Sequence, residues 1–113
     1  MSSADILHEL MAVVADRKRN PPEKSYTTSL FQGGTEKIGA KVTEEAAEVV
    51  EAAAEPGEEG RQHLIREAAD LIYHLLVMLA HRDADLQEVE AELARRFGIS
   101  GIDEKASRTG DSK

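Results

Sequence analysis

Apolar residues recur every three or four positions along most of the chain, a spacing that places them on one face of an α-helix. Breaker residues interrupt this pattern at three places, 20–22, 32–34 and 55–57. The intervening pattern predicts helices over about residues 4–19, 35–54, 58–82 and 85–97. No segment alternates apolar and polar residues as a half-buried strand does. We therefore predict an all-α fold, a bundle of four to five helices.

Local signals refine the ends of these helices. Thr35 follows two glycines and is the expected N-cap of the second helix. Asp85 and Glu88 have the spacing of a capping box, and Gly98 is the expected stop of the last helix. The β-branched segment 25–31 is predicted to be irregular, with one turn of helix.

Length and charge restrict the possible classes of protein. A chain of 113 residues suits a single domain, 1–113, in which 99–113 is expected to be a surface or partner-docking tail. The net charge of −8 argues against nucleic acid or an anionic membrane as a partner. The absence of cysteine excludes disulfides, cysteine-ligated zinc and thiol nucleophiles.

Neither a membrane span nor a signal peptide is predicted from the composition of the chain. The stretch 64–80 carries Arg66, Glu67, Asp70 and His74, so we do not expect it to span a bilayer. Residues 1–5 lack the basic and apolar blocks of a signal peptide. We expect a cytoplasmic protein.

The same stretch contains the feature that points to chemistry. Its apolar residues point in every direction around the helix axis, which predicts a helix buried on most sides. Glu67 and Asp70 nevertheless lie within it, three residues apart and therefore neighbours on its surface. A buried carboxylate must be paired, protonated or bound to a metal, because burying it alone costs several kcal/mol or more. A chain this small has few surfaces to cover such a helix, so we also expect a homodimer or larger homo-oligomer.

The second predicted helix supplies a matching pair of acids. Glu45 and Glu48 are three residues apart, and Glu45 falls on the border between the polar and apolar faces. The short connection at 55–57 predicts that the two helices pack antiparallel, which places the two acid pairs at similar height. Converging carboxylates without cysteine predict a hard-cation site, and we expect Mg²⁺, with Mn²⁺ as a possible substitute.

Structural alternatives exist for each of these side chains. Glutamates on helices are commonly solvated partners of nearby lysines, and Glu44, Glu48 and Glu51 fit that description. Glu67 and Asp70 could form salt bridges with Arg66 or Lys41 within a bundle. His74 fits a hydrogen-bonded core histidine better than a metal ligand. A protein in which all these acids formed ion pairs would be a non-catalytic helical interaction domain.

The spacing Glu45-x-x-Glu48 followed by Glu67-x-x-Asp70 resembles the ExxE…ExxD signature of the all-α, MazG-like nucleotide pyrophosphohydrolases. The flanking text, from Ser29 to Glu48, from Glu67 to Val77 and from Ser100 to Arg108, is similar to the phosphoribosyl-ATP pyrophosphohydrolase family of histidine biosynthesis. The similarity extends over about residues 4–108. One departure is Thr43, where many members have glycine next to the acids.

The resemblance implies hydrolysis of 1-(5-phosphoribosyl)-ATP to 1-(5-phosphoribosyl)-AMP and pyrophosphate, with bound Mg²⁺. It implies four metal ligands, which are Glu45, Glu48, Glu67 and Asp70. Glu44 is then a further ligand, a group that supports the ligands or a base that activates water, and Glu45 is the other candidate catalytic acid. A housecleaning (d)NTP pyrophosphohydrolase of the same superfamily is the alternative activity.

Candidate substrate-binding residues are less sharply defined. Lys37 and Lys41 lie on the acidic stripe, where they either contact phosphate oxygens or pair with neighbouring glutamates. Gly34 either lets backbone approach the substrate or simply begins the helix. Lys105 and Arg108 either reach the 5′-phosphate of the substrate or dock on a partner subunit.

Overall fold

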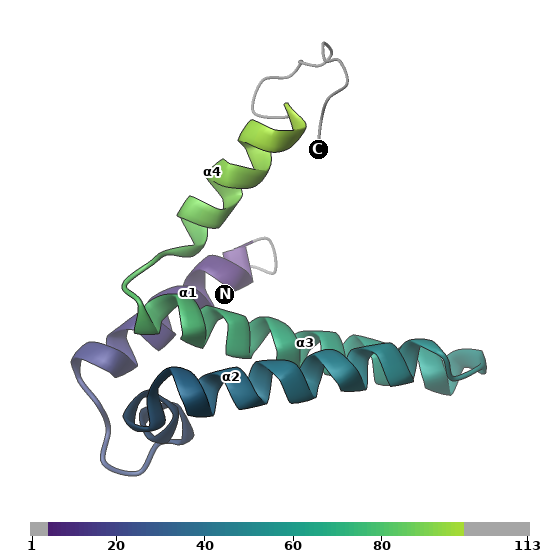
Figure 1. Cartoon of the computed structure of the whole chain (residues 1–113), viewed down its shortest axis with the longest axis horizontal. Coiled ribbons are helices and arrows are strands. Elements are labelled where there is room, and N and C mark those ends of the chain that lie inside the picture. Colours follow the sequence, from purple (N-terminus) through teal and green to yellow (C-terminus); the bar gives the residue numbers. More distant parts are fainter. Residues whose placement is uncertain (1–4, 99–113) are drawn as a thin grey trace.

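The computed structural model describes residues 5–98, and four α-helices account for most of this part of the chain. They are α1 (Ile6–Arg19), α2 (Tyr26–Ala53), α3 (Gly57–His81) and α4 (Leu86–Phe97). Helices α2 and α3 form a long antiparallel hairpin, α1 packs against it, and α4 extends away from these three (Figure 1). No strand occurs between residues 5 and 98, so the all-α prediction is confirmed. The expected tail 99–113 lies outside the described residues.

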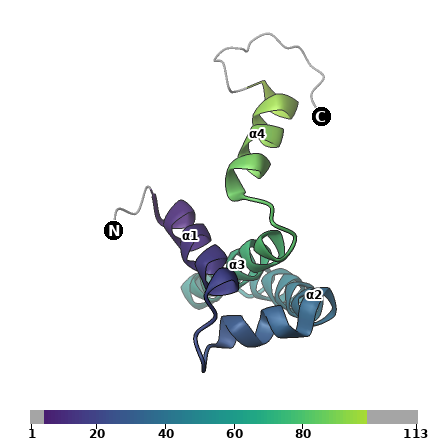
Figure 2. The same ribbon diagram turned by 90° about the vertical axis from the view of Figure 1, so that its left-hand side faces the viewer.

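Helix α2 has a sharp bend at Gly34, which divides it into two halves. Gly34 has φ 71° and ψ −164°, a conformation that is open to glycine and almost no other residue. The first half crosses the view in Figure 2, whereas the second half runs into its depth beside α3. The bend confirms the predicted break, but the non-helical residue there is Gly34 and not the expected N-cap, Thr35.

The first half of α2 corrects the prediction of an irregular segment at 25–31. Tyr26 begins a regular helix because Ser25 caps it, its side chain accepting a hydrogen bond from the backbone N–H of Thr28. The hydroxyl of Thr28 also donates to the carbonyl of Pro22. The β-branched residues suggested irregular structure, but these local hydrogen bonds and tertiary packing outweigh a weak intrinsic propensity.

The expected end signals of α4 are present. The side chain of Asp85 accepts from the N–H of Gln87, and the side chain of Glu88 accepts from the N–H of Asp85. Gly98 ends the helix in the left-handed conformation. The helix is connected to α1 by a hydrogen bond between His8 Nε2 and Glu90 Oε2, at 2.9 Å.

A small core joins α1, α2 and α3. Its most deeply buried large side chains are Val14, Leu30, Ile38 and Val77. They come from all three helices and from both halves of α2, so the core holds the bent helix against its neighbours. This packing fixes the register of α2 against α3, which determines where the acidic side chains meet.

Helix α3 is less covered than its composition predicted. Ile65, Ile72 and Leu75 are 48 %, 39 % and 43 % exposed, so the prediction of a helix buried on most sides is wrong for a single chain. The reason is that α1 and α2 cover only part of its circumference, while α4 points elsewhere (Figure 1). Between residues 5 and 98, no helix has both the length and the apolar character needed to cross a bilayer.

Candidate metal centre

Three carboxylates from the α2–α3 hairpin converge on one point. Glu45, Glu67 and Asp70 each present an oxygen atom to a cluster in which all three lie within 4.8 Å of one another. Glu45 comes from α2 and is 7 % exposed, whereas Glu67 and Asp70 come from α3. The antiparallel pairing of the two helices therefore brings both halves of the predicted site together. Asp70 is more exposed than its apolar sequence context suggested, which leaves one side of the cluster open to solvent.

Two oxygen atoms of this cluster have no partner. Glu45 Oε1 and Glu67 Oε1 are buried and accept no hydrogen bond. A buried acceptor without a donor is costly, and for a carboxylate the cost is larger than for a neutral group. A divalent cation would satisfy both atoms and cancel the repulsion between the charges. The residues present therefore fit a hard cation bound through oxygen.

Glu48, the fourth predicted ligand, also contacts the cluster. A hydrogen bond with Glu67 raises the pKa of Glu48 above its ordinary value, and partial burial adds to this effect. The four predicted ligand residues thus form one group of side chains, in which three meet directly and Glu48 joins through Glu67.

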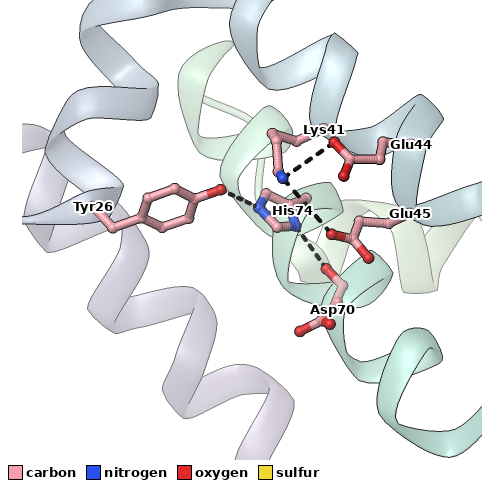
Figure 3. A network of polar contacts seen from close by, with 6 residues as sticks. All are labelled: Tyr26, Lys41, Glu44, Glu45, Asp70 and His74. Carbon is pink, nitrogen blue, oxygen red and sulfur yellow. Dashed lines mark hydrogen bonds and ion pairs between the residues drawn. The ribbon is translucent and has the colours of Figure 1, made fainter. Parts of the chain in front are cut away.

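Lys41 and Glu44 form a neighbouring pair on α2. Lys41 Nζ lies 3.2 Å from Glu44 Oε1 and 4.0 Å from Glu45 Oε2 (Figure 3). The hydrogen bond to Glu44 raises the pKa of Lys41, so its ammonium stays charged beside the acids. Glu44 is exposed and outside the convergent group of three, so it pairs with the lysine, as the structural alternative had it.

Two of the four remaining candidates for binding the substrate, Lys37 and Gly34, lie within the described residues. Lys37 is exposed on α2 and packs over Gly33, where an added Cβ would lie 2.5 Å from the Cβ of Lys37. Gly34 forms the bend of α2, which accords with its role as a helix start. Lys105 and Arg108 lie outside the described residues.

A hydrogen-bonded network next to the cluster connects the first half of α2 to α3 (Figure 3). The buried His74 has its Nδ1 2.8 Å from the backbone carbonyl of Asp70 and its Nε2 2.8 Å from the hydroxyl of Tyr26. A carbonyl only accepts, so Nδ1 donates to it, and in the neutral imidazole Nε2 accepts from the hydroxyl of Tyr26. Partial burial raises the pKa of Tyr26, which keeps its hydroxyl a donor. His74 is therefore a core histidine with both nitrogens occupied, as its sequence context indicated.

Two contacts of Tyr73, one aromatic and one a hydrogen bond, strengthen this connection. The rings of Tyr26 and Tyr73 stack with centroids 6.4 Å apart, and the hydroxyl of Tyr73 is hydrogen-bonded to Thr27. Sequence reasoning missed the role of Tyr26 because it treated segment 25–31 as irregular. The serine cap at position 25 was the signal that could have revealed the helix.

His63 is the other residue that the sequence analysis did not single out. Its Nε2 lies 3.3 Å from Glu67 Oε2, and its Nδ1 lies 3.0 Å from Glu55 Oε1. The hydrogen bond to Glu55 is the main reason that the pKa of His63 is raised. The i, i+4 spacing of His63 and Glu67 was a usable signal, because it places the two on one face of a helix. The contact with Glu55 was not readable from spacing.

The fold and the site together define an all-α protein with a carboxylate cluster suited to a divalent cation, an arrangement used by enzymes that act on phosphate groups. The chain belongs to the phosphoribosyl-ATP pyrophosphohydrolase family, whose profile matches residues 7–97. This match confirms the resemblance drawn from the motifs.

Relatives from several bacteria cover nearly the whole chain. A protein of Rhodopirellula baltica is 58 % identical over 102 residues, which are 90 % of this chain and 85 % of the relative. A protein of Paracoccus denitrificans is 54 % identical over 90 % of this chain and 92 % of its own length. One of Paramagnetospirillum magneticum is 52 % identical over 91 % and 92 %. All three bear the name phosphoribosyl-ATP pyrophosphatase.

Proposed function

We propose that this chain is an enzyme that hydrolyses 1-(5-phosphoribosyl)-ATP to 1-(5-phosphoribosyl)-AMP and pyrophosphate, a step of histidine biosynthesis. The relatives share a name that states this activity, and each match covers most of this chain and most of the relative. The single structural observation that supports it best is the pair of buried, unpartnered oxygens in the acidic cluster. A cytoplasmic location belongs to the same proposal and depends on the composition of the chain.

In this proposal, Glu45, Glu48, Glu67 and Asp70 hold Mg²⁺, with Mn²⁺ as a substitute. The bound cation would neutralise the anionic phosphates and lower the pKa of the attacking water. The reaction adds water across the anhydride between the α and β phosphates, so one P–O bond forms and one breaks. The open side of the cluster at Asp70 is the side from which a triphosphate could approach.

The lysines then have a second role besides their ion pairs. Lys41 keeps its charge beside the acids, and it lies where a phosphate oxygen could replace the carboxylate of Glu44. Released from this pair, Glu44 would be free to accept a proton from water. Lys37, Gly34, Lys105 and Arg108 remain candidates for binding the substrate.

Turnover assays separate this proposal from its rivals. Pyrophosphate release should be measured with Mg²⁺ for phosphoribosyl-ATP and for a panel of dNTPs, and we expect preference for phosphoribosyl-ATP. A preference for a dNTP would favour the housecleaning alternative. Glu45→Gln and Asp70→Asn should abolish turnover while circular dichroism stays helical. The control Glu51→Gln, an exposed acid on the same helix, should be active. Full turnover in both cluster variants would contradict the ligand roles of these acids, and the absence of turnover in the wild type would favour the interaction domain.

We further propose that the protein is a homodimer or larger homo-oligomer. The exposed apolar side chains of α3, which are Ile65, Ile72 and Leu75, support this proposal because a second copy would cover them. Sedimentation at micromolar concentration tests it, and a stable monomer would contradict it.

A further inference from the structure

The imidazole of His63 bridges two carboxylates at the end of the helical hairpin. Its Nε2 contacts Glu67 Oε2 at 3.3 Å, and its Nδ1 contacts both oxygens of Glu55, at 3.0 and 3.1 Å. The other oxygen of Glu67, Oε1, is one of the two buried atoms without a partner. His63 therefore occupies one oxygen of a proposed ligand and leaves the second oxygen free for a cation.

The connection between α2 and α3 brings Glu55 into this position. Gly60, in the first turns of α3, lies directly against Glu55, and a Cβ there would be 2.3 Å from the Glu55 carbonyl oxygen. The N–H of Gly60 also donates to the carbonyl of Pro56, at 3.3 Å. Only a residue without a side chain at position 60 allows the connection to lie this close to the helix. The close approach at Gly60 thus allows the connection to place Glu55 against His63.

We propose that His63, anchored by Glu55, is a positioning residue that fixes the carboxylate of Glu67 for cation binding. This inference deepens the proposed function and depends on its metal site. A glutamate has three rotatable side-chain bonds, so a free Glu67 would lose entropy on binding a cation, whereas an anchored one has already lost it. Partners of this kind, which orient a ligand through a hydrogen bond, typically change metal affinity by about 10- to 100-fold.

A simple alanine substitution would not isolate this effect. When protonated between its two carboxylates, His63 carries a positive charge, and removing that charge by itself favours cation binding. His63→Ala and His63→Gln both remove the charge. Only glutamine keeps a donor at the position of Nε2, which is three bonds from Cβ in both side chains. The difference between these two variants therefore reports the polar contact with Glu67 at equal side-chain charge.

Binding of Mn²⁺ alone to the full-length protein, followed by the electron paramagnetic resonance signal of free Mn²⁺, is the readout. We expect the dissociation constant of His63→Ala to exceed that of His63→Gln by about tenfold or more. Both variants should fold, because His63 is 34 % exposed and borders an open hollow of about 500 Å³, so truncation encloses no cavity. Thermal melts without metal check this expectation.

A second pair of variants tests the anchor independently. Glu55→Ala and Glu58→Ala each remove one negative charge from the same end of the hairpin. Within residues 5–98, Glu58 is bonded only to Arg61 and Gln62 on its own helix, so it is the matched control. We expect Glu55→Ala to weaken Mn²⁺ binding several-fold more than Glu58→Ala does, because it frees His63 to turn away from Glu67.

The outcomes separate this inference from the proposed function. If wild-type protein binds Mn²⁺ but His63→Ala and His63→Gln have equal dissociation constants, the positioning role is wrong and the metal site stands. Equal effects of Glu55→Ala and Glu58→Ala would remove Glu55 from the inference. If the wild-type protein does not bind Mn²⁺, both the metal site and the positioning role are overturned.

Discussion

Replacing Glu45 by glutamine removes one charge from the acidic cluster while keeping the size and shape of the side chain. The carboxylate is buried, and its neighbours Glu67 and Asp70 each present an oxygen within 4.8 Å. Two like charges at this separation repel by about 1 kcal/mol in the dielectric of water and by about 3.5 kcal/mol at an effective dielectric constant of about 20. Lys41, at 4.0 Å, offsets one of the two repulsions. We therefore expect the metal-free variant to exceed the wild type in free energy of unfolding by about 1–3 kcal/mol.

Magnesium should reverse this order. A ligand at 100 times its dissociation constant stabilises the folded state by about 2.7 kcal/mol. The wild type would receive this stabilisation, whereas the variant lacks one carboxylate and binds more weakly. For a domain of this size, 1 kcal/mol corresponds to about 4–8 °C in melting temperature. The variant should melt several degrees above the wild type in EDTA and should gain much less on addition of Mg²⁺.

Thermal melts in EDTA and in saturating MgCl₂, at equal protein concentrations, measure both effects. Glu51→Gln is the control, because it removes an exposed charge from the same helix and should respond to Mg²⁺ as the wild type does. A Glu45→Gln variant that melts below the wild type in EDTA would show that ion pairing satisfies this carboxylate. An equal gain from Mg²⁺ would show that Glu45 is no ligand.

Two further predictions concern the bend of α2 and the last helix. Gly34→Ala should lower stability by about 1–3 kcal/mol, because only glycine readily adopts its backbone conformation. Gly39→Ala is the control, because a Cβ at this helical position would meet its neighbours at ordinary contact distances. In a denaturant titration, this variant should be as stable as the wild type or more stable. Equal losses of stability in both variants would contradict the argument. On α4, two arginines lower the pKa of Glu92 from 4.5 to about 2. The contribution of these two ion pairs to the free energy of unfolding is complete above pH 4.5 and is lost as the pH falls toward 2. Melts from pH 5 to 2 should show this loss in the wild type and not in Glu92→Gln, and parallel curves would refute it.

The helices themselves were largely predictable. Periodicity located all four, and the capping box at Asp85 and the stop at Gly98 marked α4 at both ends. Segment 25–31 was the failure, because its β-branched residues have low helix propensity. Its helix depends on the Ser25 cap and on contacts of Tyr26 and Thr27 with residues of α3 that are more than 40 positions away. Propensity is local and cannot report such contacts.

The candidate site was predictable to a similar degree. The two acid pairs could be placed opposite each other because a short connection forces antiparallel packing and a helix repeats every 3.6 residues. The contacts of Glu55 with His63 and of His74 with Tyr26 were not predicted, and the pairing of Lys41 with Glu44 was only one of two alternatives. Each depends on a rotamer or on the path of a connection. Many such arrangements are compatible with the same spacing.

By itself, the sequence determined the helical class, the family and the identity of the acids that meet, because these follow from residue type and spacing within single helices. Tertiary structure alone decided how those acids are held. The bend at Gly34 turns the first half of α2 toward α3, and Gly60 allows the connection to place Glu55 next to His63. The tertiary structure also decided how exposed α3 is, because the residues of a helix do not specify how many neighbouring helices will cover it.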